Sequence, residues 1–351
     1  SGSADLVIQL AVNFSSADLN GLEVISPLTL ISTATLRDGN GNHAALNFAP
    51  LLMPAVTIDS KKPTTSKLAV VTAKIYKAGD TLSLLAEFDK PVVITNTPRI
   101  AVLIGATTVY ANYVSSPANN KALFNLSIGF GHNDSDGISI IGPLDVAGAS
   151  IKDLYNNDID TGLPVISNGP IYVDNTAPNV LTVVGPSNGH YKVGSLLLFN
   201  VTFDSPVQVY GGPKLVLAIG GKFYFADLLQ EISTTEKVFA YTVGPDVASS
   251  TGISLDSAFD MNVGGIKDIA GNNLINIIAT PDLTGVNVDV VSPWITSISV
   301  PLSKTYKLAE VLEFDLQFNE PVNVSNNISL TPRIALNIGG VFVNADYLSS
   351  V

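Results

Sequence analysis

The chain has 351 residues, with 18 Lys and Arg against 30 Asp and Glu, and no cysteine. The absence of cysteine excludes zinc–thiolate sites, disulfides and thiol catalysis, and a net charge of −12 argues against a nucleic-acid partner, which requires clustered Lys and Arg. No apolar run approaches the roughly 20 residues of a membrane span, so direct membrane insertion is not expected.

Short stretches in which apolar and polar residues alternate recur along the chain. A period of two is typical of half-buried β-strands. Turn residues separate these stretches, and no amphipathic helix is long enough to compete with them. In the part of the chain where the pattern is clearest, it predicts strands at 68–73, 81–88, 99–104, 109–113, 122–128, 137–141 and 171–173.

The same motifs return at a step of 115 residues, so the chain is a tandem array. The step relates Tyr76-Lys77 to Tyr191-Lys192 and Tyr306-Lys307. It also relates Phe88-Asp89 to Phe203-Asp204 and Phe318-Asn319, Arg37-Asp38 to Lys152-Asp153 and Lys267-Asp268, and Asp59 to Asp174 and Asp289. With about eight short strands per 115-residue repeat, the expected fold is all-β, a series of tandem immunoglobulin-like β-sandwich domains.

Two phases of the array are open. If each unit begins at a proline-bearing segment, 60–174 and 175–289 are complete repeats, 1–59 is the second half of a repeat, and 290–351 is the first half. Residues 6–14 then align with residues 123–131. Half a sandwich exposes apolar faces and open strand edges. Either the halves complete one another between molecules, or the domains are 1–117, 118–233 and 234–351.

The motifs at 173–178, 191–194, 203–207, 213–221 and 265–272 resemble, in order and spacing, one repeat of the bacterial immunoglobulin-like modules of giant surface adhesins. The resemblance covers essentially the whole chain. It implies a secreted, extracellular stalk segment at the cell surface, which projects an adhesive tip, has no enzymatic activity and has neighbouring repeats as its partners. The modules of this family are often stiffened by calcium. The resemblance leaves the host or matrix receptor unknown.

Aspartates at the ends of the units are candidate calcium ligands. Strand parity brings the loop after the second strand back to the linker, which places Asp89 beside Asp59, Asp204 beside Asp174 and Asn319 beside Asp289. The loops of Asp38, Asp153 and Asp268 are expected to reach the junctions from the preceding unit. Because Ca²⁺ binds six to eight oxygen ligands, each junction is predicted to hold a structural calcium ion. The alternative is that these side chains only cap turns by bonding to the local backbone.

Nothing in the sequence indicates a catalytic site. The three histidines, His43, His132 and His190, have no histidine at the positions 115 residues away, so no imidazole belongs to the shared scaffold. A nucleophilic triad needs such a base. The repeated tyrosines Tyr76, Tyr191 and Tyr306 could form a sugar-stacking platform, but packing over the edge of the sandwich is the favoured interpretation.

Two other functions compete with the stalk. The first is a self-assembling surface filament, in which residues 290–351 of one molecule complete residues 4–59 of the next by head-to-tail association. The second is a carbohydrate-binding module on one unit.

Overall fold

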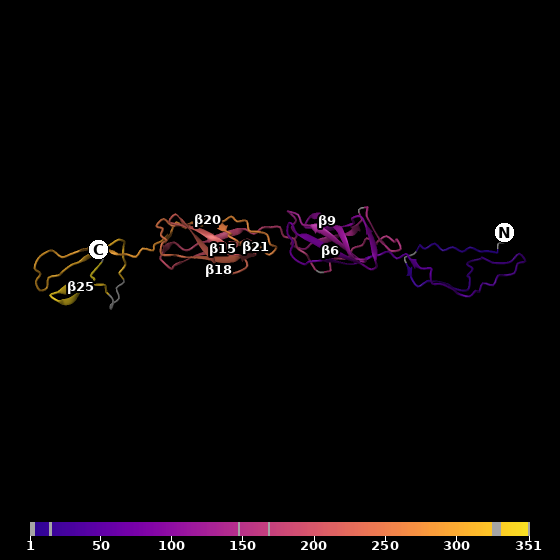
Figure 1. Ribbon diagram of the computed structural model, residues 1–351, viewed down its shortest axis with the longest axis horizontal. Coiled ribbons are helices and arrows are strands. Elements are labelled where there is room, and N and C mark those ends of the chain that lie inside the picture. The colour runs from indigo at the N-terminus through magenta and orange to yellow at the C-terminus, as the bar shows by residue number, and fades with distance from the viewer. Residues whose placement is uncertain (1–3, 14–15, 147, 168, 325–330, 350–351) are drawn as a thin grey trace.

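The computed structural model describes the chain except for residues 1–3, 14–15, 147, 168, 325–330 and 350–351. Strands without helices make up the regular structure of the described residues, so the predicted all-β class with β-sandwich domains is confirmed. Figure 1 shows two compact units in the middle of an elongated molecule, with a more open segment at each end. We call these the N-terminal half (4–59), the first unit (60–174), the second unit (175–289) and the C-terminal half (290–351).

The first unit is an antiparallel sandwich whose two faces share one long strand. Strand β9 pairs with β8 through residues 107–112 and with β10 through residues 112–118, so it leaves one sheet and enters the other. The strand order is β11-β8-β9-β10-β6-β5, and β12 pairs with β7. The strands are β5 (Thr65–Val70), β6 (Thr81–Phe88), β7 (Val92–Thr95), β8 (Arg99–Ile104), β9 (Thr107–Ala118), β10 (Lys121–Ser127), β11 (Ser139–Asp145) and β12 (Ser150–Asp153).

Alternation in the sequence decides which side chains enter the core. In β6 every second residue is buried, from Leu82 to Phe88, and in β10 the buried positions are Ala122, Phe124 and Leu126. The two strands pair in register, with Leu84 opposite Phe124. Burial of these apolar side chains supplies the main stabilisation of the sandwich.

The second unit repeats this plan. Its strands β15 and β19 pair with Phe199 opposite Phe239, 115 residues after the pair Leu84 and Phe124. A parallel pair, β14 with β22, joins the start of the unit to its end. The strands are β13 (Val180–Val184), β14 (Gly189–Tyr191), β15 (Leu196–Phe203), β16 (Val207–Tyr210), β17 (Lys214–Ile219), β18 (Lys222–Glu231), β19 (Glu236–Thr242), β20 (Ile253–Asp260), β21 (Gly265–Asp268) and β22 (Val286–Val288).

Each unit has its own core. The buried residues of one cluster run from Leu68 to Val173, and those of the other run from Val183 to Val288. No residue is common to the two clusters. Each cluster draws on both sheets of its own sandwich, so each unit is held together by its own contacts.

The two terminal halves contain only short ladders. Apolar side chains that would be buried in a complete unit are exposed here, among them Ile8 at 71% and Ile298 at 50%. The expected exposure of apolar faces is therefore confirmed for the described residues. The strands are β1 (Ala17–Asp18), β2 (Leu22–Val24), β3 (Leu51–Met53) and β4 (Ile58–Asp59) in the N-terminal half, and β23 (Ile295–Ser299), β24 (Asp315–Phe318), β25 (Arg333–Ile338) and β26 (Val341–Asp346) in the C-terminal half.

The pairing corrects the alignment of the N-terminal half by one residue. Asp18 pairs with Ile58 as Asp134 pairs with Val173 in the first unit. This places residue 6 at the position of Ala122, whereas aligning 6–14 with 123–131 would place it at Leu123. A slip of one residue turns every side chain to the opposite face of a strand, so the correction decides which residues of 5–12 are core positions.

The described part of the chain contains no helix that is long and apolar enough to cross a membrane.

Candidate functional site

The linker aspartate of each junction forms the same turn. Its carboxylate oxygen Oδ1 accepts a hydrogen bond from the backbone N–H two residues later, at 2.9 to 3.0 Å. Such a turn is a usual role for aspartate in loops. The three donor–acceptor pairs are Lys61 to Asp59, Thr176 to Asp174 and Val291 to Asp289.

The loop after the second strand returns to the linker, as strand parity predicts. The Thr64 N–H donates to Oδ1 of Asp89 at 2.8 Å, and the Asp89 N–H donates to the Thr64 carbonyl at 3.0 Å. This two-way clamp recurs 115 residues later between Asn179 and Asp204. It also recurs between Trp294 and Asn319 in the C-terminal half.

These clamps keep the carboxylates ionised. Burial would raise the pKa of Asp89, but the Thr64 N–H and the nearby Lys61 ammonium outweigh it and lower the pKa. At Asp204 the hydrogen bond from the Asn179 N–H is the main cause of a lowered pKa. Asp89 and Asp204 therefore fasten the first strand of a unit to the end of its second strand.

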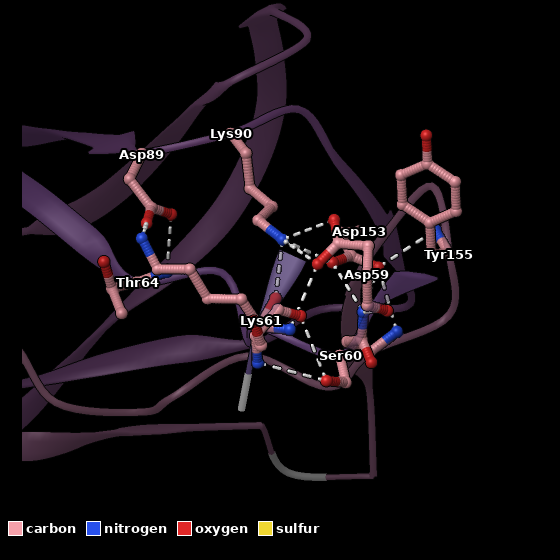
Figure 2. Close-up of polar contacts among 10 residues, drawn as sticks. Asp59, Ser60, Lys61, Thr64, Asp89, Lys90, Asp153 and Tyr155 are labelled. Carbon is pink, nitrogen blue, oxygen red and sulfur yellow. Dashed lines mark hydrogen bonds and ion pairs between the residues drawn. The ribbon is translucent and has the colours of Figure 1, made fainter. Parts of the chain in front are cut away.

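A lysine ammonium occupies the centre of the first junction. Lys90 Nζ donates to Oδ1 and Oδ2 of Asp59 at 3.0 and 2.8 Å, and to Oδ2 of Asp153 at 3.0 Å. It also donates to the Lys61 carbonyl at 2.5 Å. Figure 2 shows the ammonium between the two carboxylates, with Asp89 turned away toward Thr64. The side chains of Asp59, Asp153 and Lys90 are 5%, 1% and 19% exposed, so this ion pair is largely shielded from water.

The pKa values of the first junction favour the charged forms. Burial would lower the pKa of Lys90, but hydrogen bonds to Asp59 and Asp153 outweigh it and the pKa is raised. Burial would raise the pKa of Asp153, but hydrogen bonds from Asn157 and Lys90 outweigh it and the pKa is lowered. The junction is therefore a charged network at neutral pH.

These shifts predict how the stability of the first unit depends on pH. A lowered pKa in the folded state gives stability that is present above the unfolded pKa and is lost as the pH falls through the folded value. We expect the free energy of unfolding to be nearly constant from pH 7 to 5 and to fall below about pH 4. Because the pKa of Lys90 is raised, its contribution should persist up to about pH 10.

Chemical denaturation of the wild-type protein and of Asp153→Asn between pH 2.5 and 7 checks this prediction. The variant should lose less stability over the acid range than the wild type does. Equal losses in the two proteins would show that Asp153 does not contribute to the acid transition.

The turns of Asp153 and Asp268 lie at a different junction from the one predicted. Asp153 was expected at the junction that follows its unit, but it contacts Lys90 at the junction that precedes it. The Asp268 turn likewise lies at the start of its own unit, because Asn272 in this turn contacts Asp174. Pairing of β12 with β7 and of β21 with β16 carries each turn back toward the linker from which its unit begins.

Asp38 is also placed differently. An antiparallel ladder runs from the pair Asp18 and Ile58, through Leu22 and Met53, to the pair Arg37 and His43. Asp38 lies at the turn that closes this ladder, where its carboxylate accepts hydrogen bonds from Asn40 and Asn42. It is therefore at the opposite end of the ladder from Asp59 and does not contribute to the first junction.

Two asparagines that were not predicted to have a role tie the units to their linkers. Asn157 Nδ2 donates to the Asp59 carbonyl at 2.9 Å, and Asn272 Nδ2 donates to the Asp174 carbonyl at 2.9 Å. Both also bond to the aspartate that opens their turn, Asp153 or Asp268. A signal was present in the sequence, because Asn157 and Asn272 are 115 residues apart.

The second junction has the same frame without the lysine. The residue equivalent to Lys90 is Ser205, whose hydroxyl lies 3.2 Å from Oδ1 of Asp204. Asp268 is 5% exposed and is bonded by Asn272, and no ion pair joins it to any described residue. The stem of Lys77 from the first unit approaches Gly271 in this turn. The backbone φ of Gly271 is +90°, and a Cβ there would lie 3.3 Å from the lysine stem, so this contact favours glycine.

The fit to calcium differs between the two junctions. At the first, the Lys90 ammonium already satisfies the carboxylates of Asp59 and Asp153, so the residues do not fit a Ca²⁺ ion. At the second, Asp174 and Asp268 offer carboxylate oxygens, and no lysine or arginine among the described residues forms an ion pair with either. Across the described residues, no three His, Asp or Glu side chains are gathered closely enough to hold a metal ion.

The repeated tyrosines are structural. Tyr76 is 1% exposed, and its hydroxyl donates to the Thr72 carbonyl at 2.6 Å. The hydroxyls of Tyr191 and Tyr306 donate in the same way to the carbonyl four residues earlier. A buried ring cannot stack on a sugar, so packing is the correct interpretation of Tyr76.

A scan against protein-family models and a search of curated protein sequences found no match to this chain.

Proposed function

We propose that this chain is a non-enzymatic extender segment from the stalk of a bacterial cell-surface adhesin, exported to the outside of the cell. The observation that carries the proposal is the repeated fastening of the linkers. At both complete junctions an asparagine of the following unit, Asn157 or Asn272, holds the carbonyl of the linker aspartate. At the second junction, Asn175 also bonds back to the preceding unit, through Ala78, Gly129 and His132.

Hydrogen bonds that hold the linkers are expected in a segment whose function is to span distance. A short linker that is hydrogen-bonded on both sides limits bending between units, whereas a free Gly/Ser linker would behave as a flexible coil. The elongated arrangement in Figure 1 agrees with this function. Each further unit with this linker lengthens the molecule, and this function requires no reactive side chain.

Small-angle X-ray scattering tests the proposed rigidity. The wild-type protein should give the distance distribution of a rod, whereas Asn157→Ala with Asn272→Ala should give a broader distribution with a smaller mean end-to-end distance. Leu154→Ala is the matched control, because this apolar side chain lies in the same turn, is 70% exposed and cannot hydrogen-bond to the linker. If the double variant scatters like the wild type, these asparagines do not set the stiffness.

We further propose that calcium stiffens the second junction and not the first. Asp174 and Asp268 would be the carboxylate ligands, because Asp204 is bonded to Asn179 through both carboxylate oxygens. Asp289 and Asn319 are the residues equivalent to Asp174 and Asp204 at the next junction. The first junction, with Asp59, Asp89 and Asp153, uses Lys90 in place of a metal ion. In each arrangement a cation, the Lys90 ammonium or Ca²⁺, offsets the repulsion between the carboxylates.

Calorimetry with calcium and with a chelator tests this proposal. Calcium should raise the melting temperature of the second unit by several degrees, since a ligand at 100 times its dissociation constant adds about 2.7 kcal/mol. The melting of the first unit should not change. Ser205→Lys should abolish the response of the second unit, and Lys90→Ser should give the first unit a response. No change in either wild-type transition on chelation would refute calcium binding here.

A further inference from the structure

Each terminal half keeps the pairings of a complete unit that are internal to it. In the C-terminal half, Ile295 pairs with Phe318 as Val180 pairs with Phe203 in the second unit. In the N-terminal half, the pair Asp18 and Ile58 reproduces the pair Asp134 and Val173 of the first unit. The pairings that each half lacks are those that cross from the first half of a sandwich to the second.

The N-terminal half presents an exposed apolar segment, residues 6–12, that precedes its first strand. The register of Asp18 places residues 6, 8, 10 and 12 at positions that are buried in the first unit, where they are occupied by Ala122, Phe124, Leu126 and Ile128. Here the alternate residues are exposed instead: Leu6 at 63%, Ile8 at 71%, Leu10 at 71% and Val12 at 48%.

The C-terminal half presents the complementary strand. Residues 312, 314, 316 and 318 correspond to Leu82, Leu84, Ala86 and Phe88, which are buried in the first unit. They are apolar here too and only half-buried: Leu312, Phe314, Leu316 and Phe318. Polar or charged side chains lie between them, including Glu313 and Gln317.

Both complete units show how these two strands join. In the first unit Phe124 lies opposite Leu84, and in the second Phe239 lies opposite Phe199, in the same antiparallel register. Carried over to the terminal halves, this register places Ile8 opposite Phe314, Leu6 opposite Leu316 and Leu10 opposite Leu312. Each apolar residue would then meet an apolar residue on the same face.

The two halves of one molecule cannot make this contact. Two complete units separate them along the chain, and Figure 1 shows the halves at opposite ends of the molecule. A second copy of this chain carries the complementary segment. We propose that residues 5–11 of one copy pair antiparallel with residues 311–317 of a second copy, so that a complete sandwich forms across two chains.

The contact joins two different surfaces, so a pair of molecules keeps one free half at each end. A heterologous contact of this kind extends head to tail unless it closes into a ring. The inference goes beyond the stalk function and does not depend on calcium. It is a property of the terminal strands alone, and it can fail while the proposed function holds.

Sedimentation velocity and light scattering on the full chain test the proposal. Between about 1 and 200 μM the mass should rise from 36.7 kDa through multiples of that value. Ile8→Asp or Phe314→Asp should each weaken self-association at least tenfold, because a charge would be buried in the new core. Val7→Asn is the matched control: Val7 is 90% exposed and faces the opposite side of the segment, and an uncharged polar side chain there should leave association unchanged.

A mixture gives the sharpest result. Ile8→Asp leaves the C-terminal half intact, and Phe314→Asp leaves the N-terminal half intact, so an equimolar mixture should form dimers that do not grow further. The melting of the two complete units should be the same in all variants, which separates loss of contact from loss of folding. A mass of 36.7 kDa at every concentration overturns the proposal. Assembly that is unchanged by Ile8→Asp and by Phe314→Asp, or that responds equally to Val7→Asn, overturns it as well.

Because the chain has no cysteine, disulfide crosslinking between introduced cysteines can determine the register of the proposed pairing. Gln9 is expected opposite Glu313, as Asn125 lies opposite Ser83 in the first unit. Chains with Gln9→Cys and chains with Glu313→Cys should form a disulfide-linked heterodimer when mixed and oxidised. Gln9→Cys with Gln317→Cys should not, because four residues of strand, about 13 Å, separate these positions. Equal yields from the two mixtures would overturn the proposed register.

Discussion

Phe124→Ala is expected to lower the free energy of unfolding of the first unit by about 3–5 kcal/mol. The ring is completely buried, and it packs edge-on against Tyr113 with the ring centroids 6.0 Å apart. The surrounding strands are held by their ladders and can only partly close the cavity. The second unit should keep its stability, because its buried residues form a separate core.

Differential scanning calorimetry measures this effect, with Phe239→Ala as the partner experiment. Phe239 is the equivalent residue 115 positions later and is also fully buried, so its substitution should lower only the transition of the second unit. Phe223→Ala is the control, since this ring is 69% exposed and its loss should move neither transition. If either core substitution lowers both transitions equally, the units do not unfold independently.

Lys90→Ala is expected to destabilise the first unit by about 3 kcal/mol. The substitution leaves Asp59 and Asp153 close together, nearly buried and without the cation that both contact. The effect should lie at the low end of the range for a buried pair, because the lysine side chain is 19% exposed and water can enter the gap.

Urea denaturation of three variants separates the ion pair from general surface effects. Lys61→Ala removes an exposed lysine at the same junction, 3.6 Å from Asp89, and should cost no more than about 1 kcal/mol. Adding Asp59→Asn to Lys90→Ala should recover part of the loss, since one of the two facing charges is then removed. If Lys90→Ala and Lys61→Ala lower the free energy of unfolding equally, Lys90 contributes no more to stability than an exposed lysine does.

The fold class could be predicted from the sequence because the signals are local and repeated. The alternation from Thr81 to Phe88 identifies a half-buried strand without knowledge of its neighbours, and the structure buries every second residue of it. The return of the same motifs at a step of 115 residues indicates that one fold is repeated. A repeated pattern also predicts exposed apolar faces wherever only half of the pattern is present.

Part of the site could also be predicted. Strand parity places the Asp89 loop at the linker, because a second antiparallel strand must return to the end from which the first began. Parity does not say what the carboxylate contacts there. Asp89 accepts a hydrogen bond from the Thr64 N–H at 2.8 Å, because the backbone N–H needs an acceptor.

The placement of the turn around Asp153 needed the pairing of strands that are distant in sequence. β12 pairs with β7, and this pairing carries the turn to the start of its own unit. The sequence pattern alone was compatible with either end. The prediction that Asp153 lies at the following junction was wrong for this reason.

By itself, the sequence determined that the chain consists of repeated β-sandwich units, because side-chain alternation and turn residues act over a few positions and recur at a fixed step. Only the tertiary structure decided which cation the junction carboxylates face. Lys90 is 31 residues from Asp59 and 63 from Asp153, and their contact depends on three chain segments that meet only after folding. Such contacts depend on which distant strands pair with one another, and a local sequence pattern carries no information about that pairing.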